Sequence, residues 1–294
     1  MKKIFYLLLS TLVISACTNA NPEDKEKEKF IENLMSKMTL EEKAGQMNQY
    51  NGFWDATGPM PEGDYQKKRY EELKNGQVGS MLNVIGVDQI RALQKIAVEE
   101  TRLGIPLIFG HDVIHGYKTI FPIPLAESCS WDLELMEKSA RVAATEASAD
   151  GLHWTFAPMV DISRDARWGR VMEGAGEDPF LGSLVAQARV SGFQGENLSD
   201  VNTIIGCAKH FAGYGFSEAG RDYNTADFNE YTLHNSIMPP FKAAVDAGVR
   251  TFMNSFNTID EIPATGHKNI QRDILKEDWN FDGFIVSGWG SIDQ

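Results

Sequence analysis

The stretch Trp154-Thr-Phe-Ala-Pro-Met-Val160 is an uninterrupted apolar run that ends at a charged residue, Asp161. A helical pattern follows over 179–194, and then a second apolar run, Thr203-Ile-Ile-Gly-Cys-Ala208, which ends at Lys209. Short apolar runs bounded by polar residues are typical of strands that are covered on both faces. The stretch therefore predicts a strand–helix–strand unit whose two strands are parallel.

The same alternation runs through most of the chain. About seven strand–helix units over ~260 residues favour a TIM-type (β/α)8 barrel over a doubly wound sheet, and no Gly-rich phosphate loop follows any strand. A complete barrel has eight units, so we expect an α/β barrel over 30–294 that is truncated after the seventh unit. The other apolar runs are 45–50, 79–84, 106–110, 249–255 and 283–287, and the other helical patterns are 88–102, 132–150, 229–247 and 269–277.

Two aspartates and two cysteines give local expectations within this fold. Asp88 and Asp132 stand at the start of helical patterns, where a carboxylate can cap the first turn. Cys129 and Cys207 could pair, but nothing in their spacing demands a disulfide. Two buried free thiols are the better interpretation, because Cys207 lies inside an apolar run.

The first residues predict export. Lys2 and Lys3 precede an apolar run over 4–14, and Ser15-Ala16-Cys17 follows, as in a signal peptide over 1–17. The run is too short to span a membrane, which takes about 20 apolar residues. Cys17 stands where a lipoprotein is cleaved and lipidated, although an ordinary signal peptide with a chance cysteine remains an alternative. The charged segment 18–29 is expected to be a solvated tether.

Charge excludes one class of partner. The 294 residues carry a formal net charge of −13, and no Lys/Arg block occurs after the N-terminus. A nucleic-acid partner is therefore not expected. The composition suits a protein that acts on a neutral substrate, with membrane contact only through a lipid at Cys17.

Polar residues gather at the carboxyl ends of the predicted strands, where TIM barrels place their active sites. Asp112 follows the run 106–110, Arg170 lies in the segment after 154–160, and Lys209 and His210 follow 203–208. Each alone could be a helix cap or a satisfied polar group, but several strand ends carry them together. Mixed donors and acceptors beside the indole of Trp289 suit a sugar. His111 and His115 lack a helical zinc motif, so no metal or cofactor is expected.

Four motifs resemble glycoside hydrolase family 3, in its bacterial β-glucosidase and β-xylosidase branch, from about residue 34 to 294. The resemblance implies that Asp112, Arg170, Lys209 and His210 bind hydroxyls of the terminal sugar, that Arg221 supports the pocket and that Trp289 walls it. The motifs are Phe109-Gly-His-Asp-Val-Ile-His-Gly-Tyr117, Arg164-Asp-Ala-Arg-Trp-Gly-Arg170 with Gly176-Glu-Asp-Pro179, Ala208-Lys-His-Phe211 with Gly220-Arg-Asp-Tyr-Asn224, and Gly283-Phe-Ile-Val-Ser-Gly-Trp-Gly290.

The last motif departs from the family at one position. The family's nucleophile is the Asp of a Gly-Phe-Val-Ser-Asp-Trp-type motif, and Gly288 stands at that position here. The general acid/base of this branch lies in a second, α/β sandwich domain, expected beyond residue 294. Asp293 is too far along the chain to take over, and Asp282 lies at the opposite end of the predicted strand.

The resemblance implies a retaining β-glucosidase-like enzyme that hydrolyses terminal non-reducing β-D-glucosyl residues of oligosaccharides or β-glucosides. We expect this chain to be inactive, because it lacks both catalytic carboxyl groups. An exported sugar-binding pseudoenzyme is the alternative. The expected location is the periplasm or, as a lipoprotein, the outer membrane of a Gram-negative bacterium.

Overall fold

The computed structural model describes residues 22–52 and 63–292. In this part of the chain seven strands run parallel, in chain order, each beside the next. Hydrogen bonds join the first four into one sheet and the last three into another, and parallel bridges from Trp154 to Ile205 and from Met159 to Lys209 link the two. The strands are β1 (Gln49–Asn51), β2 (Ser80–Leu82), β3 (Ile108–His111), β4 (Trp154–Thr155), β5 (Cys207–Phe211), β6 (Thr251–Asn254) and β9 (Phe284–Val286).

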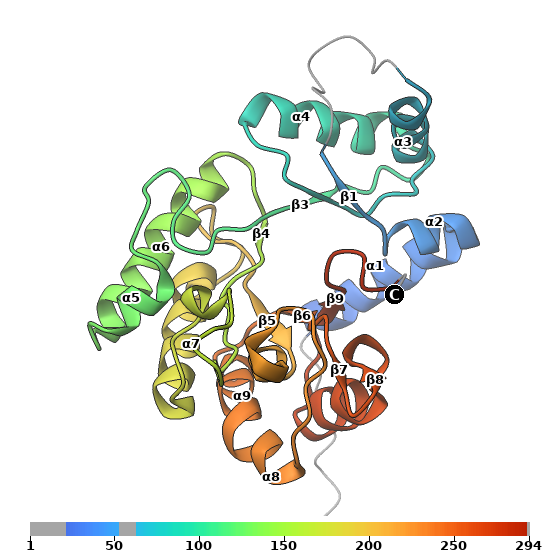
Figure 1. The fold of residues 1–294 in the computed structure, drawn as a ribbon. Helices are drawn as coiled ribbons and strands as arrows, with labels where there is room; N and C mark the ends of the chain where they lie inside the picture. Colours follow the sequence, from blue (N-terminus) through green and yellow to red (C-terminus); the bar gives the residue numbers. More distant parts are fainter. Residues whose placement is uncertain (1–21, 53–62, 293–294) are drawn as a thin grey trace, which may run out of the picture.

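Helices connect successive strands and pack outside them (Figure 1). All five helical patterns predicted from the sequence form helices, and α7 has the predicted bounds. They are α4 (Val87–Lys95) with η1 (Ile96–Glu100), α6 (Leu133–Ala149), α7 (Pro179–Gln194), the run of α8 (Glu230–Thr232), η5 (Leu233–Ile237) and α9 (Met238–Asp246), and η7 (Asn269–Asp278). Two large apolar clusters fill the space between helices and strands, one around Phe109 and one around Phe211 and Phe252.

Several elements were not predicted. They are the helices α1 (Pro22–Lys37), α2 (Leu40–Gly45), α3 (Asp64–Lys74) and α5 (Pro124–Ser128), and the antiparallel pair of β7 (Thr258–Ile259) and β8 (Ile262–Pro263). The tether expected over 18–29 needs correction, because from Pro22 onward its residues belong to α1. Lys and Glu alternate over 25–29, so opposite charges can meet along one helix face at a spacing of three residues.

Two local expectations were wrong. Asp132 caps α6 as predicted, since its side chain accepts a hydrogen bond from the Leu135 amide, but Gly86 and not Asp88 is the N-cap of α4. Cys207 is buried, whereas Cys129 is exposed; both thiols are free.

The structure does not test the predicted export signal. The signal peptide and Cys17 lie outside the described residues. Within 22–52 and 63–292, no helix has the length and apolarity needed to cross a membrane.

Candidate functional site

An ion pair joins the ends of β3 and β5. The Lys209 ammonium group donates to Asp112 Oδ1 at 2.9 Å, across 97 residues of sequence. The Lys209 side chain is only 3% exposed, whereas that of Asp112 is 51% exposed. The Asp112 carboxylate is therefore accessible from solvent, and the Lys209 ammonium group lies buried beneath it with its charge compensated.

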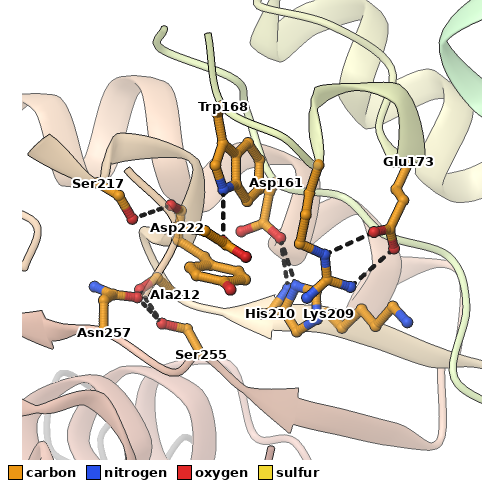
Figure 2. A network of polar contacts seen from close by, with 12 residues as sticks. Asp161, Trp168, Glu173, Lys209, His210, Ala212, Ser217, Asp222, Ser255 and Asn257 are labelled. Atoms are coloured by element: carbon orange, nitrogen blue, oxygen red, sulfur yellow. Dashed lines mark hydrogen bonds and ion pairs between the residues drawn. The ribbon is translucent and has the colours of Figure 1, made fainter. Parts of the chain in front are cut away.

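His210 follows Lys209 and is also buried. The ladder between β5 and β6 shifts register between Lys209 and Phe211, so two consecutive side chains are placed in the same site instead of on opposite faces. Asp161 Oδ2 accepts hydrogen bonds from the His210 backbone amide at 2.8 Å and contacts His210 Nδ1 at 2.9 Å. Figure 2 shows this carboxylate lying directly against the imidazole.

Burial controls the protonation of this pair. It raises the pKa of Asp161 to about 7, although the His210 amide and the charges of Arg170 and Lys209 oppose the rise. Burial also lowers the pKa of His210 well below its usual value, and the same two cations lower it further. Two interacting groups of this kind titrate as a unit.

Arg170 reaches the site from the segment after β4. Its guanidinium donates to both carboxylate oxygens of Glu173, at 2.6 and 2.9 Å, and lies 5.5 Å above the centroid of the Tyr214 ring. Burial opposes the charge on Arg170, but the hydrogen bonds and charge of Glu173 outweigh burial and raise its pKa. A forked ion pair with a ring beneath it fixes the orientation of the guanidinium.

Gly288 follows β9 and faces an aromatic ring. A Cβ atom at this position would lie 2.6 Å from Phe256 Cε1 and 2.9 Å from Phe256 Cζ. The Phe256 ring is half-buried and is 5.8 Å from the His210 ring and 5.5 Å from that of Tyr214. The space beside Gly288 is therefore filled by a hydrocarbon ring that also packs near His210, one of the hydroxyl-binding candidates.

Two predicted site residues stand further out. Trp289 is 65% exposed. Arg221 is also exposed, and within the described residues its side chain makes no hydrogen bond or ion pair. Its neighbour Asp222 accepts a hydrogen bond from the Trp168 indole at 2.9 Å, as Figure 2 shows. The structure brings Asp112, Lys209, His210 and Arg170 together and leaves these two residues at the rim.

The two histidines near Asp112 have other partners. Nδ1 of His111 lies 3.0 Å from the Asn83 side-chain oxygen, and Nδ1 of His115 donates to the Phe121 carbonyl oxygen at 3.0 Å. Both side chains line a groove beside Asp112 that also includes Tyr117. These contacts hold the loop that presents Asp112.

Sequence reasoning gave no role to three residues that shape the site. Asp161, Glu173 and Phe256 contact predicted site residues that lie 49, 3 and 32 positions away, respectively. The spacing of Arg170 and Glu173 was a usable signal, since side chains three apart meet on one helical turn. The other two contacts depend on how separate strand ends meet, which no local pattern encodes.

The arrangement suits a small polyhydroxylated ligand. Lys209 and Arg170 supply only donors, Asp112 supplies acceptors, and the half-buried Phe256 supplies apolar ring surface. A pyranose has hydroxyls at its edge and C–H groups on its faces, so it can use both kinds of surface.

Comparisons with known proteins agree with this reading. Residues 39–294 match the glycosyl hydrolase family 3 N terminal domain. The chain is 41% identical over 266 residues to a periplasmic beta-glucosidase of Salmonella typhimurium, which covers 90% of this chain and 34% of that protein. It is 34% identical to a beta-xylosidase of Formosa agariphila, which covers 75% of this chain and 32% of the relative.

A solved structure is similar in fold as well. The beta-glucosidase from Listeria innocua in complex with glucose superposes with a TM-score of 0.83 at 42% identity, and the match covers 90% of this chain and 38% of that protein. The chain thus spans about a third of the length of these relatives.

Proposed function

The chain belongs to glycosyl hydrolase family 3, whose N-terminal domain is a TIM-barrel-like α/β fold, and from that premise we propose that its site binds the terminal β-D-glucosyl unit of a β-glucoside. The observation that carries the proposal is the convergence of Asp112, Lys209, His210 and Arg170 from three strand ends. Each is held in place by contacts within the chain, so little conformational entropy is lost when a sugar binds.

The sugar hydroxyls have matching partners. Asp112 Oδ2 accepts from hydroxyls while Oδ1 stays with Lys209, and the Arg170 guanidinium donates through Nη1, the one nitrogen that Glu173 does not use. Bonds to charged groups are the stronger ones, and they resist competition from water in a half-buried site. The Listeria innocua relative, solved in complexes with glucose and with gluconolactone, supports a glucosyl ligand.

We further propose that this chain binds the sugar without attacking it. A retaining glycosidase needs a carboxylate close to the anomeric carbon, with two carboxyl groups about 5–5.5 Å apart. Gly288 has no side chain, and the Phe256 ring occupies the space that a side chain there would need. This filled space favours the sugar-binding alternative for the chain, whereas the relatives support retaining hydrolysis for the parent family.

The N-terminus supports an exported protein. One relative is named a periplasmic beta-glucosidase, which agrees with a signal peptide over 1–17 and a lipid at Cys17. Radiolabelled palmitate supplied to expressing bacteria should label the protein, and Cys17→Ser should abolish the label.

Calorimetric titration with glucose tests the binding proposal. Wild-type chain should give saturable heat, and Asp112→Asn should bind about tenfold more weakly or worse, because a hydrogen bond to a charged group contributes about 1.5–3 kcal/mol. Asp282→Asn is the matched control, since Asp282 pairs with Arg250 at the other end of the barrel strands and should not affect affinity. Equal affinity of wild type and Asp112→Asn, or no saturable heat from folded wild type, would refute the proposal.

A further inference from the structure

The imidazole of His210 is held on one side by a carboxylate. Asp161 Oδ2 lies 2.8 Å from the His210 amide nitrogen and 2.9 Å from Nδ1, and the side chains of both residues are 1% exposed. Asp161 thus contacts the backbone and the ring of the same residue, which fixes the position of both.

The geometry indicates where the ring proton lies. Oδ2 already acts as an acceptor toward the His210 amide. Burial raises the pKa of Asp161 to about 7, so at pH 8 the carboxyl group is mostly ionised and has no proton to donate to the ring. Nδ1 is then the donor in the second contact to Oδ2. A neutral imidazole carries one proton, so Nε2 is left as an acceptor.

The rest of the ring is packed but leaves Nε2 unpaired. The Tyr214 ring meets the imidazole edge-on at 5.0 Å between centroids, and the Phe256 ring lies at 5.8 Å. Within the described residues, Nε2 makes no hydrogen bond. It is therefore the polar atom that His210 can offer to a ligand.

We propose that Asp161 is a positioning residue that holds His210 in the Nδ1–H tautomer, so that Nε2 accepts a hydrogen bond from a sugar hydroxyl. A hydroxyl that receives a bond from Lys209 or Arg170 still has its own proton to donate, and both of those side chains lack an acceptor. By holding this tautomer, Asp161 leaves His210 Nε2 as a hydrogen-bond acceptor beside the positive charges of Lys209 and Arg170. The part of this inference that concerns sugar rests on the proposed function.

The tautomer can be measured directly. Nitrogen-15 NMR of the histidine rings at pH 8, on the full chain, reports which ring nitrogen is protonated, and His210→Gln identifies the signal by its loss. Wild type should show Nδ1–H. Asp161→Asn should keep that tautomer, because the amide oxygen can still accept both hydrogen bonds. Asp161→Ala should move His210 towards Nε2–H, the form that imidazole prefers in water.

Glucose affinity gives the second readout. Asp161→Ala should bind about tenfold more weakly than wild type, and Asp161→Asn within about threefold of it. Gln194→Ala is the control for general destabilisation. Gln194 is buried and bonds backbone groups of Gly206, Gly248 and Arg250 at the amino-terminal ends of β5 and β6, so its loss should leave tautomer and affinity unchanged.

The outcomes separate the two proposals. An Nε2–H tautomer in wild type, or an unchanged tautomer in Asp161→Ala, overturns the role of Asp161. If Asp161→Ala does not fold, the wild-type and Asp161→Asn spectra still decide. Wild-type protein that shows Nδ1–H but no glucose binding contradicts the proposed function and leaves the positioning role of Asp161 supported.

Discussion

At the scale of single residues, Gly288 and Phe256 are best understood as a pair. The glycine removes a side chain, and the ring of Phe256 lies where the first atom of that side chain would be. Restoring a carboxylate therefore requires more than one change. Asp at position 288 must displace a ring that also contacts His210, Tyr214 and Tyr223.

A double-mutant cycle tests this pairing. Gly288→Ala should lower the free energy of unfolding by about 1–3 kcal/mol, as added atoms do in a packed site, and much less when Phe256→Ala is also present. Urea unfolding measures all four proteins. Gly169→Ala is the control, because a Cβ there would meet nothing within 4 Å, so its effect should stay within about 0.5 kcal/mol. Additive effects of the Gly288 and Phe256 changes would contradict the pairing.

The Asp161–His210 pair predicts a pH dependence. The folded-state pKa of His210 is lowered, so its contribution to stability is complete above pH 6.5 and is lost as the pH falls. The folded-state pKa of Asp161 is raised to about 7, so its contribution has the opposite sign, rising as the pH falls from 7 towards 3.8. In wild type, the pH-dependent contributions of His210 and Asp161 to stability therefore offset each other.

Asp161→Asn removes one of these opposing terms. Its melting temperature should fall relative to wild type as the pH is lowered from 8 to 5, because only the loss from His210 remains. Thermal melts of both proteins at several pH values measure the difference. A difference that stays constant over this range would show that the two groups are not linked as inferred.

At the scale of elements, apolar runs and helical periodicity located all seven strands and the main helix in five of the six connections between them, because buried strands and amphipathic helices leave those patterns. The helix α3 between β1 and β2 and the short α5 were not predicted. The sequence did not predict α1, whose mean composition resembles a solvated segment, or the pair β7–β8, whose strands are two residues long. The candidate site residues at the strand ends could be located because they are the polar residues that follow the apolar runs. Asp161 was missed because its contact with His210 depends on the register of β5, and Phe256 because its contact with Gly288 depends on how the segments after β6 and β9 meet.

The two predicted helix caps provide an element-scale test. Asp132→Ala should cost about 1 kcal/mol of unfolding free energy, since the Asp132 carboxylate accepts the Leu135 amide at 2.9 Å at the start of α6. Asp88→Ala should cost at most a few tenths, because Gly86 is the N-cap of α4 and Asp88 acts only through the helix dipole. Urea unfolding measures both, and equal costs would contradict the cap assignment.

At the scale of the whole molecule, the site exists only once the strands are assembled. Asp112 comes from the end of β3, Arg170 from the segment after β4, Lys209 and His210 from β5, Phe256 from beyond β6 and Gly288 from beyond β9. All stand at the carboxyl-terminal ends of parallel strands, the face that carries catalysis in TIM barrels. On the proposed function, this face carries the hydroxyl-binding residues and presents a glycine and a ring where an attacking carboxylate is needed.

The measurement that tests this claim most directly is intact-protein mass spectrometry after incubation with 2,4-dinitrophenyl 2-deoxy-2-fluoro-β-glucoside. Its leaving group departs without acid catalysis, so a nucleophile in the site is sufficient to form a covalent adduct. We predict that the mass of the wild-type chain stays unchanged while glucose binding is seen by calorimetry. A gain of one fluoroglucosyl group per chain, on any carboxylate of the site, would contradict the account.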